Sequence, residues 1–189
     1  MIVLCADFCS YSKFVHASGN DRELVISIMG RFYRETREAI VSAGGIVDKF
    51  MGDGVLAFWR LEDKAGKVWP QIDKCLMELI GISLNLATEW QDQIDLAVAP
   101  KGLRAGAAFG DILMIAETTK QASPIHAIGE CINIAARLQG EARPNTLLLS
   151  NKLKSVVPDG AKAFKKLDAK ALKNIGDTIV WEKDYGTGA

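Results

Sequence analysis

Residues 46–59 read IVDKFMGDGVLAFW. Two runs of strand-forming apolar residues flank the pair Asp53 and Gly54, and this pattern is typical of a β-hairpin. A hairpin of this kind places Lys49 and Asp53 near its tip. The stretch therefore predicts antiparallel pairing, and it leaves two charged side chains to be explained.

The rest of the chain predicts further strands and helices on both sides of this hairpin. Residues 2–8 (IVLCADF) read as a buried strand, and about 21–43 and 68–91 as amphipathic helices, the first ended by Gly44 and Gly45. LRAGAAF and DILMIA, around Gly110 and Asp111, predict a second hairpin. GECINIAARLQGEA predicts a helix, TLLLS a short strand and DTIVWEKDY an edge or closing strand. This order predicts an α+β fold.

Composition limits the class of protein. The 189 residues, 49% of them hydrophobic, predict one domain over 1–189 with a mobile tail at 185–189. Equal numbers of basic and acidic residues (23 each) argue against nucleic-acid binding. The four cysteines form no CxxC pair, and the N-terminus lacks a signal-peptide pattern. These two features predict reduced thiols and a cytoplasmic location. No apolar run is long enough to span a bilayer, so we expect no membrane contact within this chain.

Asp7 ends the first predicted strand, and Asp53 lies in the hairpin turn. If these strands are neighbours, the two carboxylates meet, and a cation between them relieves their repulsion. Mg²⁺ suits this arrangement because it binds one or two carboxylates plus substrate phosphates. After Asp7 the chain turns into a helix, where backbone N–H groups of Cys9, Ser10 and Tyr11 could hold a phosphate. The alternative is that Asp7 caps this turn and Asp53 only forms the hairpin.

Asn133 and Arg137 lie four residues apart and share one face of the predicted helix. Arginine is a strong donor to phosphate, and asparagine can hold a sugar oxygen or a water. Alternatively, Asn133 caps locally and Arg137 pairs with Glu141. The spacing alone favours this structural alternative.

Four stretches, in this order, resemble the catalytic domain of the class III nucleotidyl cyclases: VLCADFCSYSKF, GGIVDKFMGDGVLAFW, RAGAAFGDILMI and IGECINIAARLQGEA. The resemblance covers roughly residues 2–183. It implies a ferredoxin-like βαββαβ core sheet with helices on one face. It also implies a homodimer with two interfacial sites, each converting a nucleoside triphosphate (NTP) to a 3′,5′-cyclic nucleotide plus pyrophosphate.

The same resemblance implies roles for individual residues. Asp7, Asp53 and the backbone carbonyl of Phe8 would bind two divalent cations, Mg²⁺ or Mn²⁺. Asn133 would orient the ribose, and Arg137 would stabilise the phosphate in the transition state. The metals would activate the ribose 3′-hydroxyl and neutralise phosphate charge.

Other positions follow the family less closely. Lys173 lies near the place of a family lysine for the terminal phosphates, and is otherwise an exposed lysine. Lys49 aligns with the first base-reading position, as in adenylate cyclases. The second position is His126, where adenylate cyclases carry Asp or Thr and guanylate cyclases carry Cys or a similar residue. Ser10 replaces the usual glycine.

Lys49 is a donor, and neutral His126 can donate from one ring nitrogen. Two donors favour a base rich in carbonyl acceptors, such as uracil. Short members of the family resemble bacterial antiphage pyrimidine cyclases. We therefore predict a pyrimidine cyclase, UTP ahead of CTP. The alternatives are an adenylate cyclase with an atypical base-reading position, a nucleotide-binding domain without catalysis, a polymerase-like nucleotidyl transferase and, for His126, an ordinary buried histidine.

Overall fold

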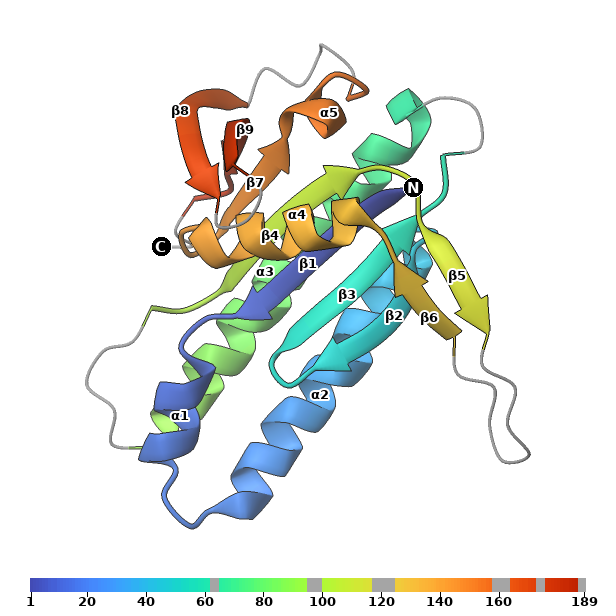
Figure 1. The fold of residues 1–189 in the computed structure, drawn as a ribbon. Coiled ribbons are helices and arrows are strands. Elements are labelled where there is room, and N and C mark those ends of the chain that lie inside the picture. The colour runs from blue at the N-terminus through green and yellow to red at the C-terminus, as the bar shows by residue number, and fades with distance from the viewer. Residues whose placement is uncertain (62–64, 95–99, 117–124, 158–163, 173–175, 187–189) are drawn as a thin grey trace.

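The computed structural model describes residues 1–61, 65–94, 100–116, 125–157, 164–172 and 176–186 (Figure 1). In chain order its elements are β1 (Ile2–Phe8), α1 (Tyr11–Ala17), α2 (Arg22–Ser42), β2 (Ile46–Met51), β3 (Gly54–Trp59), α3 (Ala65–Asp92), β4 (Leu103–Phe109), β5 (Leu113–Ala116), β6 (Ile125–Ile128), α4 (Glu130–Glu141), β7 (Thr146–Ser150), α5 (Asn151–Lys154), β8 (Lys165–Leu172) and β9 (Gly176–Asp184). The predicted α+β class is confirmed.

A seven-stranded sheet runs through the molecule in the order β2-β3-β1-β4-β7-β9-β8. β1 pairs antiparallel with β3 on one side and β4 on the other. Together with α2 and α3, the strands β1 to β4 form the predicted βαββαβ core. β7 then joins β4 in parallel after α4 crosses over, and β9 and β8 extend the sheet in antiparallel pairing.

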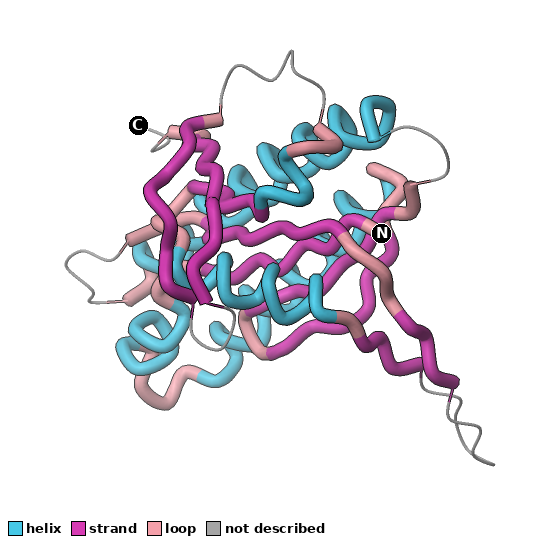
Figure 2. The backbone as a smooth tube through the Cα atoms, turned by 45° about the horizontal axis from the view of Figure 1, so that its top comes forward, coloured by secondary structure: helices cyan, strands magenta, loops and turns pink. Residues whose placement is uncertain are grey.

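The helices of the βαββαβ core, α2 and α3, lie on one face of the sheet as predicted, and α4 covers the other face. Leu4 of β1 points into the larger core beneath α2 and α3. Val3 and Cys5, on the other side of the same strand, pack against Cys131 and Ala135 of α4. A strand that is apolar on both sides must be covered on both sides. Figures 1 and 2 show α4 on the opposite face from α2 and α3.

The long helices follow the sequence pattern closely. The side chain of Asp21 caps α2 by accepting a hydrogen bond from the Leu24 N–H at 2.9 Å. Gly44 ends the helix at a φ of 74°, a left-handed conformation that favours glycine. α3 matches the second predicted helix. Among the described helices, none is both long and apolar enough to cross a membrane.

The second predicted hairpin is wrong in its pairing. Gly110 stays beside β1, since its N–H donates to the Met1 carbonyl at 3.1 Å and the Met1 amino group donates back to the Gly110 carbonyl at 2.7 Å. The chain then leaves the sheet, and β5 pairs with β6 in a separate hairpin that projects from the body (Figures 1 and 2). β8, which the sequence did not predict, forms the outer edge next to β9.

The chain is held in place as far as Tyr185, a residue that the sequence placed in the tail. The Tyr185 hydroxyl donates to Asp73 of α3 at 2.7 Å, and its N–H donates to the Asn145 carbonyl at 3.0 Å. These bonds fix the end of β9 against the core. Residues 187–189 lie outside the described part of the chain.

Candidate active site

Asp7 and Asp53 lie together where β1 and β3 meet. Asp7 is opposite Gly54, the first residue of β3. The Phe8 N–H donates to the Asp53 carbonyl at 3.0 Å, which ties the β2–β3 turn to the end of β1. The turn bends at Gly52, where the backbone φ of 63° is a left-handed conformation that glycine adopts easily. The chain thus brings together the two carboxylates that the sequence singled out.

The proximity of these two groups changes the acidity of Asp53. Burial raises the pKa of Asp53 to about 6, the negative charge of Asp7 adds to the rise, and the positive charge of Arg104 opposes it. Two carboxylates that disfavour each other's ionisation gain from a bound cation. This is the electrostatic setting that a divalent-metal site requires.

The donor set fits an octahedral cation completed by a ligand. In the described part of the chain, no group of three or more His, Cys, Asp or Glu side chains could form a protein-only cage. Mg²⁺ is ordinarily held by one or two carboxylates, with substrate phosphates and waters filling the other positions. The residues present therefore suit Mg²⁺ or Mn²⁺. The metal-binding roles of Asp7, Phe8 and Asp53 stay predictions.

Arg104 of β4 belongs to this site, and the sequence analysis missed it. Arg104 lies opposite Asp7 on the β1–β4 ladder, and its guanidinium forms an ion pair with the Asp7 carboxylate. Its Nε is buried and has no hydrogen-bond partner within the described structure. The guanidinium thus retains donor capacity for an anion. The available signal was the one charged residue in LRAGAAF, a stretch otherwise made of small and apolar residues.

The turn after β1 fits only part of the predicted phosphate cradle. The Cys9 N–H donates to the Gly102 carbonyl at 2.9 Å, which removes it as a phosphate donor. Ser10 is the N-cap residue of α1 and has a φ of 62°. Glycine, the residue that the family usually carries here, adopts this left-handed conformation more easily than serine. Tyr11 opens the helix, where N–H groups have no acceptor within the helix. Ser10 and Tyr11 therefore keep a suitable backbone, and Cys9 does not.

α4 carries Asn133, which is exposed, and Arg137, which is half-buried. The helix lies very close to β4 because Gly106 has no side chain. A Cβ at Gly106 would lie 2.2 Å from both the Ala135 carbonyl oxygen and the Gln139 nitrogen. The position of α4 over the sheet is thus set by this single glycine.

The two halves of the predicted site are not joined within one chain. Asp7 forms its ion pair with Arg104. Among the hydrogen bonds and ion pairs of the described residues, none links Asn133 or Arg137 to Asp7 or Asp53.

Lys49 owes its position to a β-bulge. The register of β2 against β3 shifts between Val47 and Lys49, which makes Asp48 the extra residue. The Lys49 Nζ lies 3.3 Å from the Asp48 Oδ2. Lys49 lies opposite Leu56, whose side chain belongs to the core on the α4 side. The predicted base-reading lysine therefore faces the same side of the sheet as α4.

Two further residues of the predicted site are His126 and Lys173. His126 is exposed on β6, opposite Ile115 of β5, so the alternative of an ordinary buried histidine is wrong. Lys173 lies outside the described residues.

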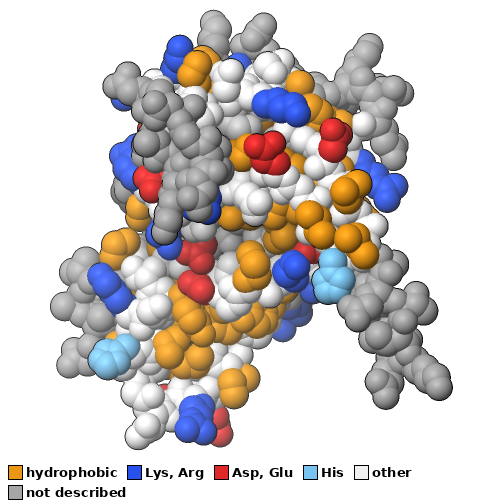
Figure 3. Space-filling model, in the orientation of Figure 1, with side chains coloured by type: hydrophobic (Ala, Val, Ile, Leu, Met, Phe, Trp, Pro, Cys, Tyr) orange, Lys and Arg blue, Asp and Glu red, His pale blue; other side chains and the backbone are white. Residues whose placement is uncertain are grey.

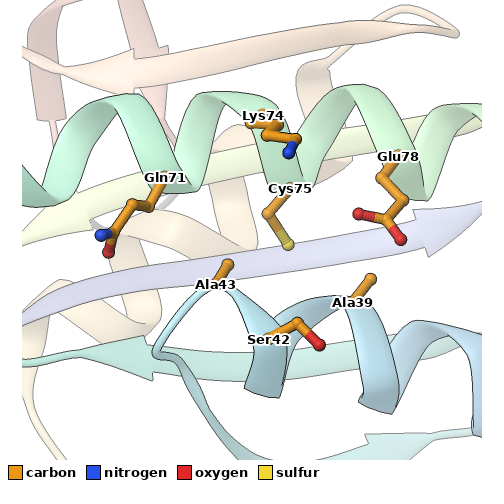
Figure 4. A pocket seen from close by; sticks show the side chains of 7 residues that line it. All are labelled: Ala39, Ser42, Ala43, Gln71, Lys74, Cys75 and Glu78. Carbon is orange, nitrogen blue, oxygen red and sulfur yellow. The ribbon is translucent and has the colours of Figure 1, made fainter.

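A cavity of about 200 Å³ lies between α2 and α3, under the other face of the sheet. Ser42, Gln71, Lys74 and Glu78 line it, and the Cys75 side chain points toward α2 (Figure 4). Burial raises the pKa of Cys75 to about 12, so this thiol stays protonated and is a poor nucleophile or metal ligand. None of the predicted site residues lines this cavity.

The sheet order, the acidic pair beside β1 and the helix packed on β4 define the fold of a class III nucleotidyl cyclase catalytic domain. The adenylyl cyclase CyaB from P. aeruginosa has the same fold, with a TM-score of 0.78 and 18% identity, over 99% of this chain and 94% of that one. The guanylyl cyclase Cya2 superposes with a TM-score of 0.74 and 15% identity, over 99% and 93%. The predicted fold is confirmed.

Sequence comparison points in the same direction. Human adenylate cyclase type 10 is 30% identical over 141 residues, which cover 73% of this chain. The rat protein of the same name is 29% identical over an equal length. This chain spans about 8% of the length of these relatives. No protein-family model matches the sequence.

Proposed function

We propose that the chain is a nucleotidyl cyclase that converts an NTP to a 3′,5′-cyclic nucleotide and pyrophosphate. The observation that carries the proposal is the pairing of Asp7 with Asp53, in which burial and the second carboxylate raise the pKa of Asp53. The fold shared with adenylyl and guanylyl cyclases supports it, as does the similarity to adenylate cyclase type 10. A carboxylate pair in this fold suits phosphate chemistry that requires divalent cations.

In this reaction the ribose 3′-hydroxyl attacks the α-phosphorus and pyrophosphate leaves. Asp7, Asp53 and the carbonyl of Phe8 would hold two divalent cations, which lower the pKa of the attacking hydroxyl and neutralise phosphate charge. Arg104, whose side chain is 35% exposed, would donate to the phosphates through its guanidinium. Arg137 would stabilise charge on the transferring phosphate.

We further propose that each site is shared between two copies of the chain. The resemblance of four sequence stretches to the class III cyclases supports this, because it implies a homodimer with two interfacial sites. The β5–β6 hairpin exposes a group of apolar side chains, as expected of an association surface. They are Leu113 (69% exposed), Met114 (47%), Ile115 (48%) and Ile128 (54%). Figure 3 shows hydrophobic side chains gathered beside this hairpin.

For the base we propose a pyrimidine, UTP ahead of CTP, with a cyclic pyrimidine nucleotide serving as an antiphage signal. The support is chemical: Lys49 faces the α4 side of the sheet, and exposed His126 can donate a hydrogen bond to a carbonyl-rich base. The second candidate is an adenylate cyclase. The names of the sequence relatives favour it, because all four are adenylate cyclases.

Turnover of all four NTPs with Mn²⁺ separates these possibilities. We expect cyclic UMP and pyrophosphate to form fastest. A tenfold preference for ATP would overturn the pyrimidine proposal and leave the cyclase intact. Absence of pyrophosphate from every NTP would overturn the cyclase in favour of a binding domain without catalysis, and primer extension would reveal a polymerase-like transferase.

Mixing inactive variants tests the shared site. Asp53→Asn and Arg137→Ala should each be inactive alone. In an equal mixture, half of the dimers are mixed and each has one intact site, so about a quarter of the wild-type activity should return. The control is a mixture of Asp7→Asn and Asp53→Asn, in which every site lacks an acid. Activity absent from both mixtures would contradict the shared site.

A further inference from the structure

Tyr33 of α2 reaches the turn that carries Asp53. Its hydroxyl donates a 2.8 Å hydrogen bond to the carbonyl of Gly52, the residue immediately before Asp53. Gly52 has a φ of 63°, and glycine has a wide choice of backbone conformations. A bond to this carbonyl therefore restricts the most adaptable point of the turn.

The ring of Tyr33 makes a second contact with the same hairpin. It lies 4.7 Å, between centroids, from the ring of Phe50 in β2. The guanidinium of Arg37, one helical turn further along α2, lies 5.4 Å from that Phe50 ring. The last residues of β2 are thus packed against α2 through aromatic and cation–π contacts.

Two hydrogen bonds hold the backbone carbonyls of Gly52 and Asp53 from outside the hairpin. One is the bond from the Phe8 N–H to the Asp53 carbonyl at 3.0 Å, from the β1 side. The other is the Tyr33 bond to Gly52, from the α2 side. The two bonds hold successive backbone carbonyls, so the loss of the Tyr33 bond removes the hold on the α2 side of the turn.

We propose that Tyr33 is a positioning residue that holds the β2–β3 turn so that the Asp53 carboxylate stays beside Asp7. Tyr33 acts through the Gly52 carbonyl and contacts neither a substrate nor a metal. The link from turn geometry to metal binding rests on the proposed function. The geometric claim about the turn does not.

The test compares two variants that each lose one hydroxyl. Tyr33→Phe keeps the ring against Phe50 and removes the bond to Gly52. Tyr185→Phe is the matched control, because its hydroxyl bonds to Asp73 at 2.7 Å, after β9, which lies toward the opposite edge of the sheet from β2. Both variants should fold, since each retains its aromatic ring.

Two readouts need no turnover. Amide hydrogen exchange of a peptide covering residues 50–56, in the metal-free protein, should be about three- to fivefold faster in Tyr33→Phe, the effect of one hydrogen bond. Binding of Mn²⁺ alone, followed by electron paramagnetic resonance, should weaken by a similar factor. Tyr185→Phe should change neither, although it should lower the melting temperature.

The outcomes are distinct. Exchange of residues 50–56 that is equal in Tyr33→Phe and wild type overturns the proposal, whatever the activity. Faster exchange with unchanged Mn²⁺ affinity overturns the link between the turn and the metal. Faster exchange in Tyr33→Phe, together with a wild-type protein that binds no Mn²⁺, contradicts the proposed function and supports the role of Tyr33 in holding the turn.

Discussion

At the scale of single residues, the acidity of Asp53 is the most informative property of the site. An aspartate is ordinarily ionised well below pH 6. The Asp53 carboxyl group has a raised pKa of about 6, because it is partly buried and because Asp7 lies beside it. In the metal-free protein this group binds a proton that the unfolded chain has already released. Its contribution to stability is therefore present at low pH and is lost as the pH rises through about 6.

Asp7→Asn tests this interaction directly. Removal of the Asp7 charge should lower the pKa of Asp53, although burial keeps it above its ordinary value. Carbon-13 NMR titration of the Asp53 carboxyl group would measure the change. In the wild type, Mn²⁺ binding should weaken as the pH falls below about 6, because protons compete for the same carboxylate. A titration of Asp53 that is unchanged in the variant would show that the two side chains are not coupled.

The residues of the site differ in how far sequence predicts them. Asp7 and Asp53 could be predicted because a strand end and an Asp-Gly turn are local patterns. Arg104 could not, because its position beside Asp7 depends on the register between β1 and β4, strands about 100 residues apart. The hydrogen bond from the Cys9 N–H to the Gly102 carbonyl, which removes this N–H as a phosphate donor, also joins residues far apart in the sequence.

At the scale of elements, α4 depends on its close approach to β4. A methyl group at position 106 would lie 2.2 Å from the backbone of the helix, a distance that no side-chain movement can relieve. The helix itself must move away, and it carries Asn133 and Arg137 with it. Its packing on β1 and β4 would loosen at the same time.

Gly106→Ala should therefore lower the free energy of unfolding by about 1–3 kcal/mol, the cost of overpacking, and should reduce turnover. Urea denaturation measures the first effect. Gly30→Ala on α2 is the control, since a Cβ there has no atom within 4 Å and should stabilise the helix by about 0.5–1 kcal/mol. Equal stability of Gly106→Ala and wild type would contradict the close packing of α4.

The elements themselves were largely predictable, and their pairing less so. Apolar periodicity and the Gly44 stop signal placed α2 to within about one residue at each end. The Gly110–Asp111 signal misled because Gly110 pairs with Met1, and the turn-like composition marks the point where the chain leaves the sheet. The place of α4 on the other face was not predictable, because a single sequence does not show that both sides of β1 need cover.

At the scale of the whole molecule, the β5–β6 hairpin projects from the main sheet. Among the described residues its two strands pair only with each other, and Leu113, Met114, Ile115 and Ile128 are exposed on it. Sequence could indicate a dimer through family resemblance alone, because exposure is a property of the folded chain.

Leu113→Asp combined with Ile115→Asp should shift the protein toward the monomer and abolish turnover, while the melting temperature of the monomer stays unchanged. Sedimentation velocity measures the association. The control is Met77→Asp on α3, where the methionine is 60% exposed on another surface. Self-association that is equally strong in the hairpin variant and the control would place the interface elsewhere.

The central position of β1 has a consequence for synthesis. Its partners β3 and β4 begin about 50 and 100 residues later in the chain. At ribosomal rates of about 5–20 residues per second, this strand waits roughly 5–20 s for its second neighbour. During that time a strand that is apolar on both sides is unprotected, which makes the nascent chain a natural client for a chaperone that acts during translation.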